Sequence, residues 1–301
     1  MQSWKVVIGL VVAISLLGTA CSGTQGVTAA TEATETAPVT ETTEAPAAAE
    51  AEPVLTIGNP DRLSNDHPTV LITGSNRGIG LEFAKQFADR GWNIIATARK
   101  PAEATDLQAL ATDNERIVIE QLDVTDTDRI SDLTNKYGDR PIDVLLSNAG
   151  ITPKYGSAFK TVSGVDWDMA RRSIEVNAIA PVRISQAFMG QVAASEQKKI
   201  VVISSKAGSF ALSPEMPMMY SYRASKAALN MYMYTLSFET VKRDVILTLL
   251  SPGQVNTTPG FKLPGAIETE ESVSKMLAVI DGLTPEHNGK FLDYEDGRVL
   301  A

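Results

Sequence analysis

The chain has 301 residues, 44% of them hydrophobic and 21% charged, and its formal net charge is −9. These proportions are ordinary for a globular protein, and the negative charge argues against a nucleic-acid binder, which needs a basic face. The single cysteine, Cys21, excludes an intramolecular disulfide and a metal centre of several cysteines. The two histidines, His67 and His287, have no further ligands at a useful spacing, so no metal site is expected.

The first residues have the pattern of an export signal. Val6–Ala20 carries no charge and is shorter than the about 20 apolar residues that span a membrane, which suits the core of a signal peptide. The run Leu17-Gly18-Thr19-Ala20-Cys21 resembles the lipobox of bacterial lipoproteins, with Leu17 four residues before the cysteine where three is usual. The resemblance implies a lipoprotein-type signal peptide over residues 1–21 and lipidation of Cys21. A plain signal peptide, or an uncleaved anchor with an incidental cysteine, is the alternative.

Residues 22–53 form a predicted linker. They consist almost entirely of Thr, Ala, Glu, Pro and Gly, a composition that cannot offset the entropy cost of ordering. As a flexible coil the segment would span roughly 30 Å, enough to hold a domain clear of a membrane. Lys5 precedes the apolar run and places the rest of the chain outside the cytoplasm by the positive-inside rule. We therefore expect a membrane-tethered protein of the bacterial cell envelope that faces outward, with a cytoplasmic location as the alternative.

Residues 54–301 are predicted to form one domain in which short apolar strands alternate with helices. In chain order the pattern predicts strands over 69–73, 93–98, 117–122, 142–147, 199–204 and 245–250, with 290–294 as a final strand. It predicts helices over 79–90, 126–137, 167–197 and 220–243. This alternation indicates an α/β fold of the Rossmann type: a doubly wound parallel sheet of six to seven strands with helices on both faces. The ligand site of such a sheet lies beyond the carboxyl ends of its strands.

A glycine-rich turn joins the first strand to the first helix. It reads Thr73-Gly74-Ser75-Asn76-Arg77-Gly78-Ile79-Gly80. Glycines there let the backbone approach a pyrophosphate, which binds free N–H groups at the positive end of the helix. Because the turn follows a strand and opens a helix, it predicts nucleotide binding.

The TGxxxGxG spacing of this turn resembles the short-chain dehydrogenase/reductases, and the resemblance extends over Thr69–Tyr294. Further family motifs follow in the expected order. They are Asp123 after the third strand, Asn148-Ala149-Gly150 after the fourth, the helix residue Asn177, Ser204-Ser205 after the fifth strand, Tyr222-Arg223-Ala224-Ser225-Lys226 as the YxxxK signature, and Pro252-Gly253 after the sixth strand.

The resemblance implies a catalytic tetrad. Ser205 would bind the carbonyl oxygen of the substrate, Tyr222 would donate the proton, and Asn177 would hold a water of the proton relay, while Ser204 would be structural. Lys226 lies four residues after Tyr222, on the same helix face, where an ammonium group would lower the pKa of the phenol from about 10. Taken alone, the pair would favour an aromatic core residue at Tyr222 and a solvated helix lysine at Lys226; together with Ser205 and Asn177 it favours catalysis.

The resemblance also implies the cofactor contacts. Asp123 would hold the adenine amino group, Thr257 the nicotinamide amide, and Lys226 the nicotinamide ribose. The full set, besides Tyr222 and Lys226, is Gly74, Ser75, Asn76, Arg77, Gly78, Ile79, Gly80, Arg99, Asp123, Val124, Asn148, Ala149, Gly150, Pro252, Gly253, Val255 and Thr257.

The choice of nicotinamide cofactor depends on charge. An acidic residue at the end of the second strand would accept from a ribose 2′-hydroxyl and repel a 2′-phosphate, but the strand ends in Arg99 and Lys100. With Arg77 in the glycine turn, these cations favour NADP(H) over NAD(H). The alternative is that Arg99 and Lys100 are solvated loop charges.

These residues predict an NADP(H)-dependent oxidoreductase that interconverts a carbonyl and an alcohol of a small molecule. A hydrolase is excluded because the chain has no G-x-S-x-G elbow. The loop Pro214–Met219 would shape the substrate entrance or be only a lengthened surface loop. By resemblance, the helices 167–197 and 220–243 would pair subunits into a homodimer or homotetramer. The rival function is an exported cofactor-binding sensor or signalling protein with little turnover, although the intact tetrad favours an enzyme.

Overall fold

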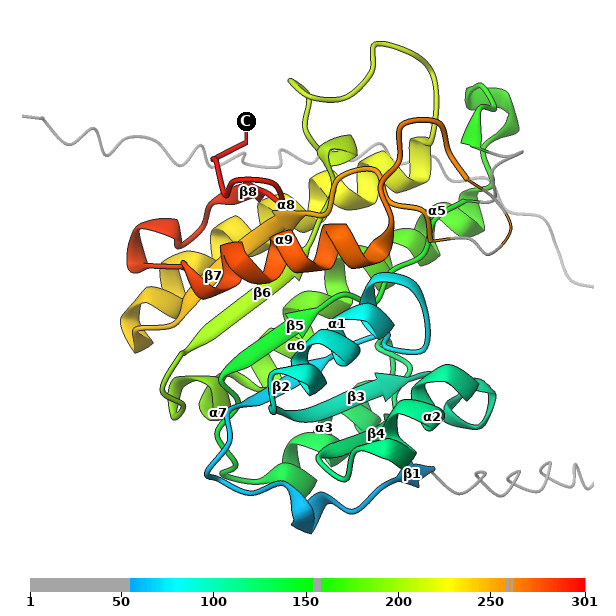
Figure 1. Cartoon of the computed structure of the whole chain (residues 1–301). Helices are drawn as coiled ribbons and strands as arrows, with labels where there is room; N and C mark the ends of the chain where they lie inside the picture. The colour runs from blue at the N-terminus through cyan, green and yellow to red at the C-terminus, as the bar shows by residue number, and fades with distance from the viewer. Residues whose placement is uncertain (1–54, 154–157, 258–259, 261, 301) are drawn as a thin grey trace, which may run out of the picture. The chain divides into compact units, whose positions relative to one another are not determined.

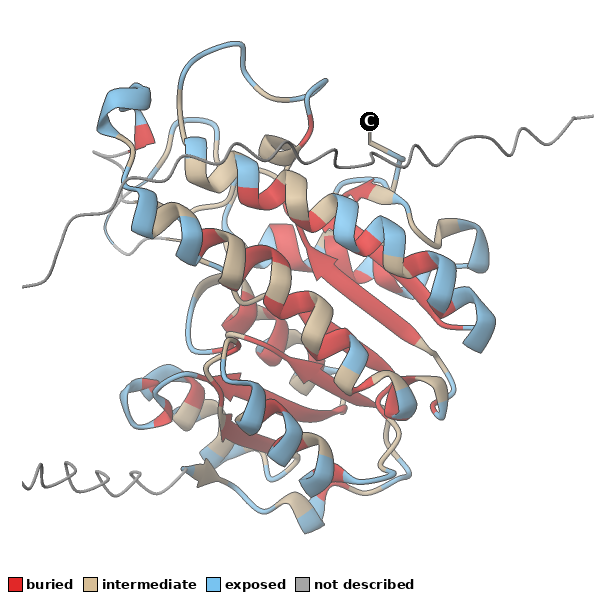
Figure 2. Ribbon diagram, turned by 180° about the vertical axis from the view of Figure 1, so that it is seen from behind, coloured by how far each residue is buried: buried red, intermediate tan, exposed pale blue. Residues whose placement is uncertain are grey.

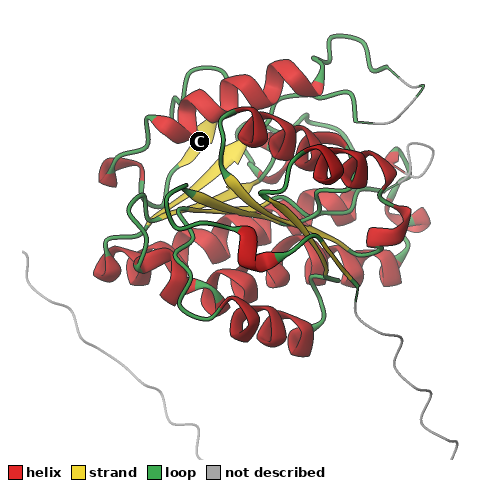
Figure 3. Ribbon diagram, turned by 60° about the horizontal axis from the view of Figure 1, so that its bottom comes forward, coloured by secondary structure: helices red, strands yellow, loops and turns green. Residues whose placement is uncertain are grey.

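The computed structural model describes residues 55–153, 158–257, 260 and 262–300. The predicted signal peptide, Cys21 and the linker lie outside these residues. The described chain forms an eight-stranded sheet in the order β1-β4-β3-β2-β5-β6-β7-β8, with helices on both faces (Figures 1 and 3). The strands are β1 (Thr56–Ile57), β2 (Thr69–Ile72), β3 (Asn93–Ala98), β4 (Ile117–Gln121), β5 (Val144–Ser147), β6 (Lys199–Ile203), β7 (Ile246–Ser251) and β8 (Phe291–Asp293).

The strands β2 to β8 pair in parallel, as the alternating pattern predicts. The order reverses at β2, which lies between β3 and β5. A doubly wound sheet of the Rossmann type is therefore confirmed. The reversal leaves a crevice beyond the carboxyl ends of the strands, which is where such sheets bind ligands.

The eighth strand, β1, was not predicted. It has only two residues and pairs antiparallel with β4. Thr56 donates its hydroxyl hydrogen to Glu120 Oε2 at 2.8 Å, and the fully buried Glu120 carboxylate also binds Arg129, Lys136 and Tyr137. A strand of two residues is too short to show an apolar periodicity in the sequence.

The helices are α1 (Gly78–Asp89), α2 (Thr105–Asp113), α3 (Thr127–Tyr137), α5 (Trp167–Ile174), α6 (Ala180–Ala187), α7 (Met189–Ala193), α8 (Tyr220–Thr240) and α9 (Thr269–Asp281). Two of these, α2 and α9, were not predicted. Helix α2 buries only Leu107 and so has little periodicity. Helix α9 does bury an apolar stripe at Val273, Met276, Leu277 and Ile280, a pattern that is visible in the sequence.

The continuous helix predicted over 167–197 is wrong in detail. A π-helical turn, Glu175–Ile179, separates α5 from α6, and Phe188 separates α6 from α7. Pro181 has no N–H to donate to the carbonyl of Asn177, four residues earlier, and its ring would crowd that carbonyl. The proline therefore explains why the helix widens at this point.

The core has two layers, one on each face of the sheet, because alternate residues of each strand point to opposite faces (Figure 2). Phe83, Phe87 and Trp92 pack in one layer, and Phe188 in the other. On α8, a stripe of residues at helical spacing, Leu229, Met233 and Thr240, is buried and faces the core. These two layers fix the strand ends that carry the candidate site.

Candidate active site

The glycine turn between β2 and α1 is held close to the end of β5. Gly74 and Gly78 have positive φ of 69° and 57°, which side chains rarely adopt. A Cβ atom on Gly74 would lie 2.9 Å from Ala149 Cα, so the turn leaves no room for a side chain there. Asn148 Nδ2 donates to the carbonyls of Thr73 and Gly74, both at 3.0 Å. The Asn-Ala-Gly motif thus braces the turn from the neighbouring strand.

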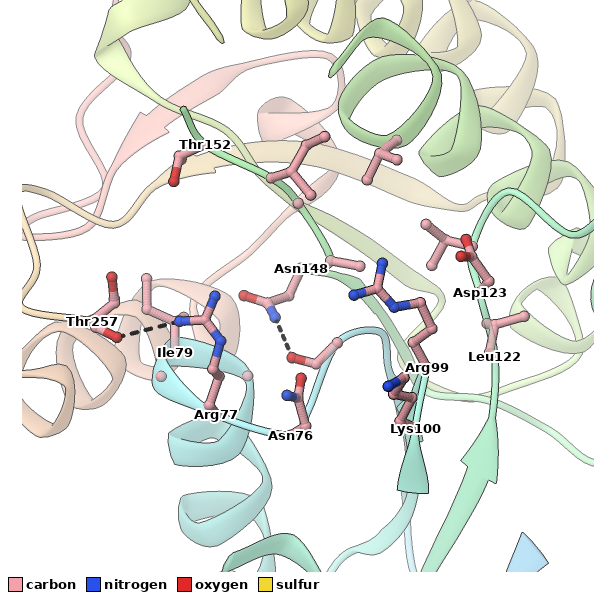
Figure 4. A pocket seen from close by; sticks show the side chains of 18 of the residues that line it. Asn76, Arg77, Ile79, Arg99, Lys100, Leu122, Asp123, Asn148, Thr152 and Thr257 are labelled. Carbon is pink, nitrogen blue, oxygen red and sulfur yellow. Dashed lines mark hydrogen bonds between the residues drawn. The ribbon is translucent and has the colours of Figure 1, made fainter. Parts of the chain in front are cut away.

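A cavity of about 420 Å³ opens above this turn (Figure 4). Thirteen of the residues predicted to contact the cofactor line it: Gly74, Asn76, Arg77, Gly78, Ile79, Gly80, Arg99, Asp123, Val124, Asn148, Ala149, Gly150 and Thr257. They come from five separate segments of the chain, so the fold brings together what the sequence spreads over more than half its length.

The other predicted contacts lie outside the lining of this cavity. Ser75 is buried, and its hydroxyl donates to the Ile72 carbonyl at 3.0 Å. Pro252 accepts a bond from Ser272, and Val255 forms a bridge with Ile267. Gly253 has a positive φ of 79° and packs against the ring of Tyr294. These four residues support the turns that surround the cavity.

The cavity has a strongly charged end near the carboxyl ends of β3 and β4. The pKa of Asp123, which lies at this end, is lowered. Burial alone would raise it, but the hydrogen bonds from Thr125 and the charges of Arg172 and Arg99 outweigh burial. Lys100 forms an ion pair with Glu103 at 2.8 Å. Within the described part of the chain, Arg99 makes no hydrogen bond or ion pair, and its guanidinium extends into the cavity (Figure 4).

The side chains of Ser205 and Tyr222 lie beside each other although the two residues are seventeen positions apart in the sequence. Ser205 follows β6 and accepts from the Ala207 N–H at 3.2 Å, and Tyr222 lies in the first turn of α8. Their side chains are hydrogen-bonded to each other. The preceding Ser204 is buried and donates to Asn230 instead. This arrangement agrees with the predicted division between a catalytic and a structural serine.

Lys226 lies on the same face of α8 as Tyr222, with Nζ 5.9 Å from the centroid of the phenol ring. It is buried and donates to the Ile203 carbonyl at 2.9 Å. Burial lowers the pKa of Lys226 to about 8. Burial raises the pKa of Tyr222, and the bond with Ser205 opposes this rise only in part. The structure therefore does not show the expected lowering of the Tyr222 pKa, because Nζ is turned toward the Ile203 carbonyl and the phenol is partly removed from water.

Asn177 lies in the π-helical turn and is buried. Its Nδ2 donates to the Ile151 carbonyl and to Ser225 Oγ, both at 2.9 Å, and its Oδ1 accepts from the Ile151 N–H at 2.8 Å. The side chain thus ties the loop after β5 to α8, and both its N–H groups are used. The water that Asn177 would hold in the proton relay stays a prediction.

No group of three or more His, Cys, Asp or Glu side chains in the described part of the chain is placed to hold a metal ion. No helix among the described residues is long and apolar enough to cross a membrane.

A family model for short chain dehydrogenases matches residues 68–263. The chain belongs to the short-chain dehydrogenase family. As a member of it, the protein is an oxidoreductase.

Individual proteins resemble this chain in sequence and in fold. An uncharacterised oxidoreductase of Schizosaccharomyces pombe is 32% identical over 253 residues, which cover 77% of this chain and 98% of the relative. The C-signal of Myxococcus xanthus is 34% identical over 159 residues, 53% of this chain and 92% of the relative. The NADPH-bound carbonyl reductase from chicken fatty liver has 32% identity and a TM-score of 0.71, and the match covers 78% of this chain and 99% of that one.

Some residues that line the cavity were missed by sequence analysis. Leu122, Ile151, Thr152 and Val176 each lie beside a motif residue, so adjacency could have identified them. Arg172 has no such signal, because it lies on α5, five residues before Asn177, and reaches the cavity only through the packing of α5.

Proposed function

We propose that the protein is an NADP(H)-dependent oxidoreductase that interconverts a carbonyl and an alcohol, with Tyr222 as general acid and base. The observation that carries the proposal is the hydrogen bond between the Ser205 and Tyr222 side chains, with the Lys226 ammonium 5.9 Å from the phenol ring. Two hydroxyl groups would then meet the same substrate oxygen, with the ammonium group close to the phenol ring. This is the arrangement needed to polarise a carbonyl and protonate it.

The cavity fits a dinucleotide. Gly74 and Gly78 free the backbone for close approach at the N-terminal end of α1, where a pyrophosphate would bind. Arg99, which has no ion-pair partner among the described residues, and Arg77 are available for a 2′-phosphate. The NADPH that the chicken carbonyl reductase binds supports the same choice of coenzyme here. When bound, the coenzyme supplies the hydride.

The protonation states favour reduction of a carbonyl. Because burial raises the pKa of Tyr222, the phenol carries its proton at neutral pH and can give it to the substrate oxygen. Ser205 would donate its own hydrogen bond to that oxygen. The charged form of Lys226, whose pKa is about 8, would then stabilise the phenolate that remains. A water held by Asn177 would relay a proton from the solvent to the phenolate.

A two-step measurement tests this function. Fluorescence titration with NADPH and NADH should give tighter binding of NADPH, and a panel of carbonyl compounds should then reveal oxidation of NADPH. Binding without turnover on any carbonyl of the panel would contradict the enzyme and favour a sensor. Failure to bind either coenzyme would overturn the whole proposal.

The second candidate is an exported cofactor-binding sensor or signalling protein of the same fold. Its specific support is the similarity to the C-signal of Myxococcus xanthus together with the lipoprotein-like first 21 residues. For either function we propose that the domain is tethered to the bacterial membrane through Cys21 and faces outward. The substrate would be a small carbonyl or alcohol, and the assembly a homodimer or homotetramer.

A further inference from the structure

Helix α5 contributes a second arginine to the charged end of the cavity. Arg172 lines the same cavity as Arg99 and Asp123, and its Nη2 lies 4.0 Å from Asp123 Oδ2. Its side chain is 51% exposed, and that of Asp123 is 32% exposed, so the pair lies at the mouth of the cavity. None of the motifs quoted from the sequence includes Arg172.

The two oxygens of Asp123 have different surroundings. Oδ1 accepts from the Thr125 N–H at 3.0 Å and from the Thr125 hydroxyl at 2.8 Å. Oδ2 faces Arg172. The Thr125 bonds and the nearby arginines keep the pKa of Asp123 low, in spite of its burial. The carboxylate is therefore charged at neutral pH, and it lines the cavity with Oδ2 beside Arg172.

The balance of charge at this end depends on Arg172. Lys100 and Glu103 pair with each other and cancel. Of the remaining lining charges here, Asp123 contributes −1, and Arg99 and Arg172 contribute +1 each, which leaves +1. Both arginines are close enough to lower the pKa of Asp123. Without Arg172, Arg99 would be the cation left to compensate Asp123, and the net charge at this end would be zero.

We propose that Arg172 is a specificity-determining residue for the coenzyme, because it neutralises Asp123 and so leaves the Arg99 guanidinium for the 2′-phosphate. The inference rests on the proposed use of NADP(H). A 2′-phosphate carries negative charge and is repelled by an uncompensated carboxylate nearby, whereas the 2′-hydroxyl of NADH is neutral. Arg172 thus acts through Asp123, and it should affect the preference for NADPH more than the binding of dinucleotides in general.

The test measures dissociation constants of NADPH and NADH by fluorescence titration and uses their ratio, the NADPH preference. Arg172→Ala should weaken NADPH about fivefold, the size expected for a half-exposed ion pair, and reduce the NADPH preference by the same factor. Arg172→Lys should keep the preference, because it keeps the charge. The double variant Arg172→Ala with Asp123→Asn should regain the preference of the wild type even if it binds both coenzymes less tightly.

The adjacent Arg171 provides a matched control. It is 77% exposed, forms an ion pair with Asp168, and does not line the cavity. Arg171→Ala should leave the preference unchanged. Three outcomes would overturn the inference while leaving NADP(H) binding intact. Arg172→Ala could weaken NADPH and NADH equally, the double variant could have no greater NADPH preference than Arg172→Ala, or Arg171→Ala could reduce the preference as much as Arg172→Ala does. A wild type that binds neither coenzyme would overturn the proposed function as well.

Discussion

Tyr222 is half-buried, with Ser205 on one side and the Lys226 ammonium near its ring. Tyr222→Phe removes only the hydroxyl group. Turnover should fall at least about 10²-fold, the usual contribution of general acid–base catalysis. NADPH binding should change little, because the phenol contacts the substrate and not the phosphates. Steady-state kinetics on any carbonyl that the wild type reduces, with a parallel titration, would check this; full activity of the variant would refute the tetrad.

Lys226 should limit the stability of the protein below pH 8. Its pKa is lowered from 10.5 to about 8, so the unfolded chain binds more protons than the folded one between these values. Stability from this group therefore rises with pH from about 8 upward, and the charged form opposes folding below it.

The variant Lys226→Met tests this linkage. It should raise the free energy of unfolding at pH 7 by roughly 1–3 kcal/mol, and the gain should shrink by pH 9. Denaturant unfolding of both proteins at the two pH values measures it, and the variant should lose turnover. A gain that is the same at both pH values would mean that burial of the charge does not carry the effect.

Arg99 is exposed at the end of β3 and points into the cavity. Arg99→Ala should weaken NADPH binding by about 1.5–3 kcal/mol, the size of a hydrogen bond to a charged group. NADH binding should stay nearly constant, because it lacks the phosphate. Titration of both coenzymes decides the matter: equal losses would show that Arg99 does not contact the 2′-phosphate.

At the scale of the secondary-structure elements, the outer face of α8 carries an exposed apolar stripe. Met231, Tyr234, Phe238 and the following Val241 are 64%, 49%, 58% and 54% exposed and recur at helical spacing. A stripe of this kind is typical of an interface between subunits. It lies opposite the buried stripe of Leu229 and Met233, so core and interface faces of α8 are separate.

We expect this stripe to form a subunit contact. Sedimentation at micromolar concentration should reveal a dimer or tetramer, and Phe238→Glu should shift it toward the monomer without loss of the folded state. Substitution of the exposed Lys242, which lies beyond α8, is a suitable control. A wild-type protein that sediments as a monomer would refute the predicted assembly.

The elements that could be predicted are those whose own residues determine them. The seven parallel strands are continuous apolar runs, and the glycine turn, Ser205 and Tyr222 lie directly at strand or helix ends. Strand β1 and the position of Arg172 depend on contacts between segments that are distant along the chain. The π-helical turn has a local cause, Pro181, which the sequence shows but which was not used to divide the predicted helix. The shift of the Tyr222 pKa was predicted in the wrong direction. Sequence spacing shows that Lys226 lies on the same helix face as Tyr222, but it does not show that Lys226 Nζ donates a hydrogen bond to the Ile203 carbonyl.

At the scale of the whole molecule, the location of the protein remains a prediction that rests on its first 53 residues. Fractionation of cells that produce the wild type or Cys21→Ala should find the wild type in the membrane and the variant released from it. Equal membrane association of the two proteins, or a wild type in the cytoplasm, would contradict lipidation of Cys21.

The two residues of β1 have a consequence for solubility. Strand β4 would otherwise be the edge of the sheet, with unpaired N–H and C=O groups that can template the addition of a strand from another molecule. Thr56 and Ile57 pair with that edge, and the Thr56 hydroxyl donates a hydrogen bond to the buried Glu120 carboxylate. A shortened chain that starts at residue 68, where the family match begins, keeps every candidate catalytic residue and yet uncovers the edge. We expect that chain to aggregate during refolding, as followed by light scattering, while a chain that starts at residue 54 stays monodisperse.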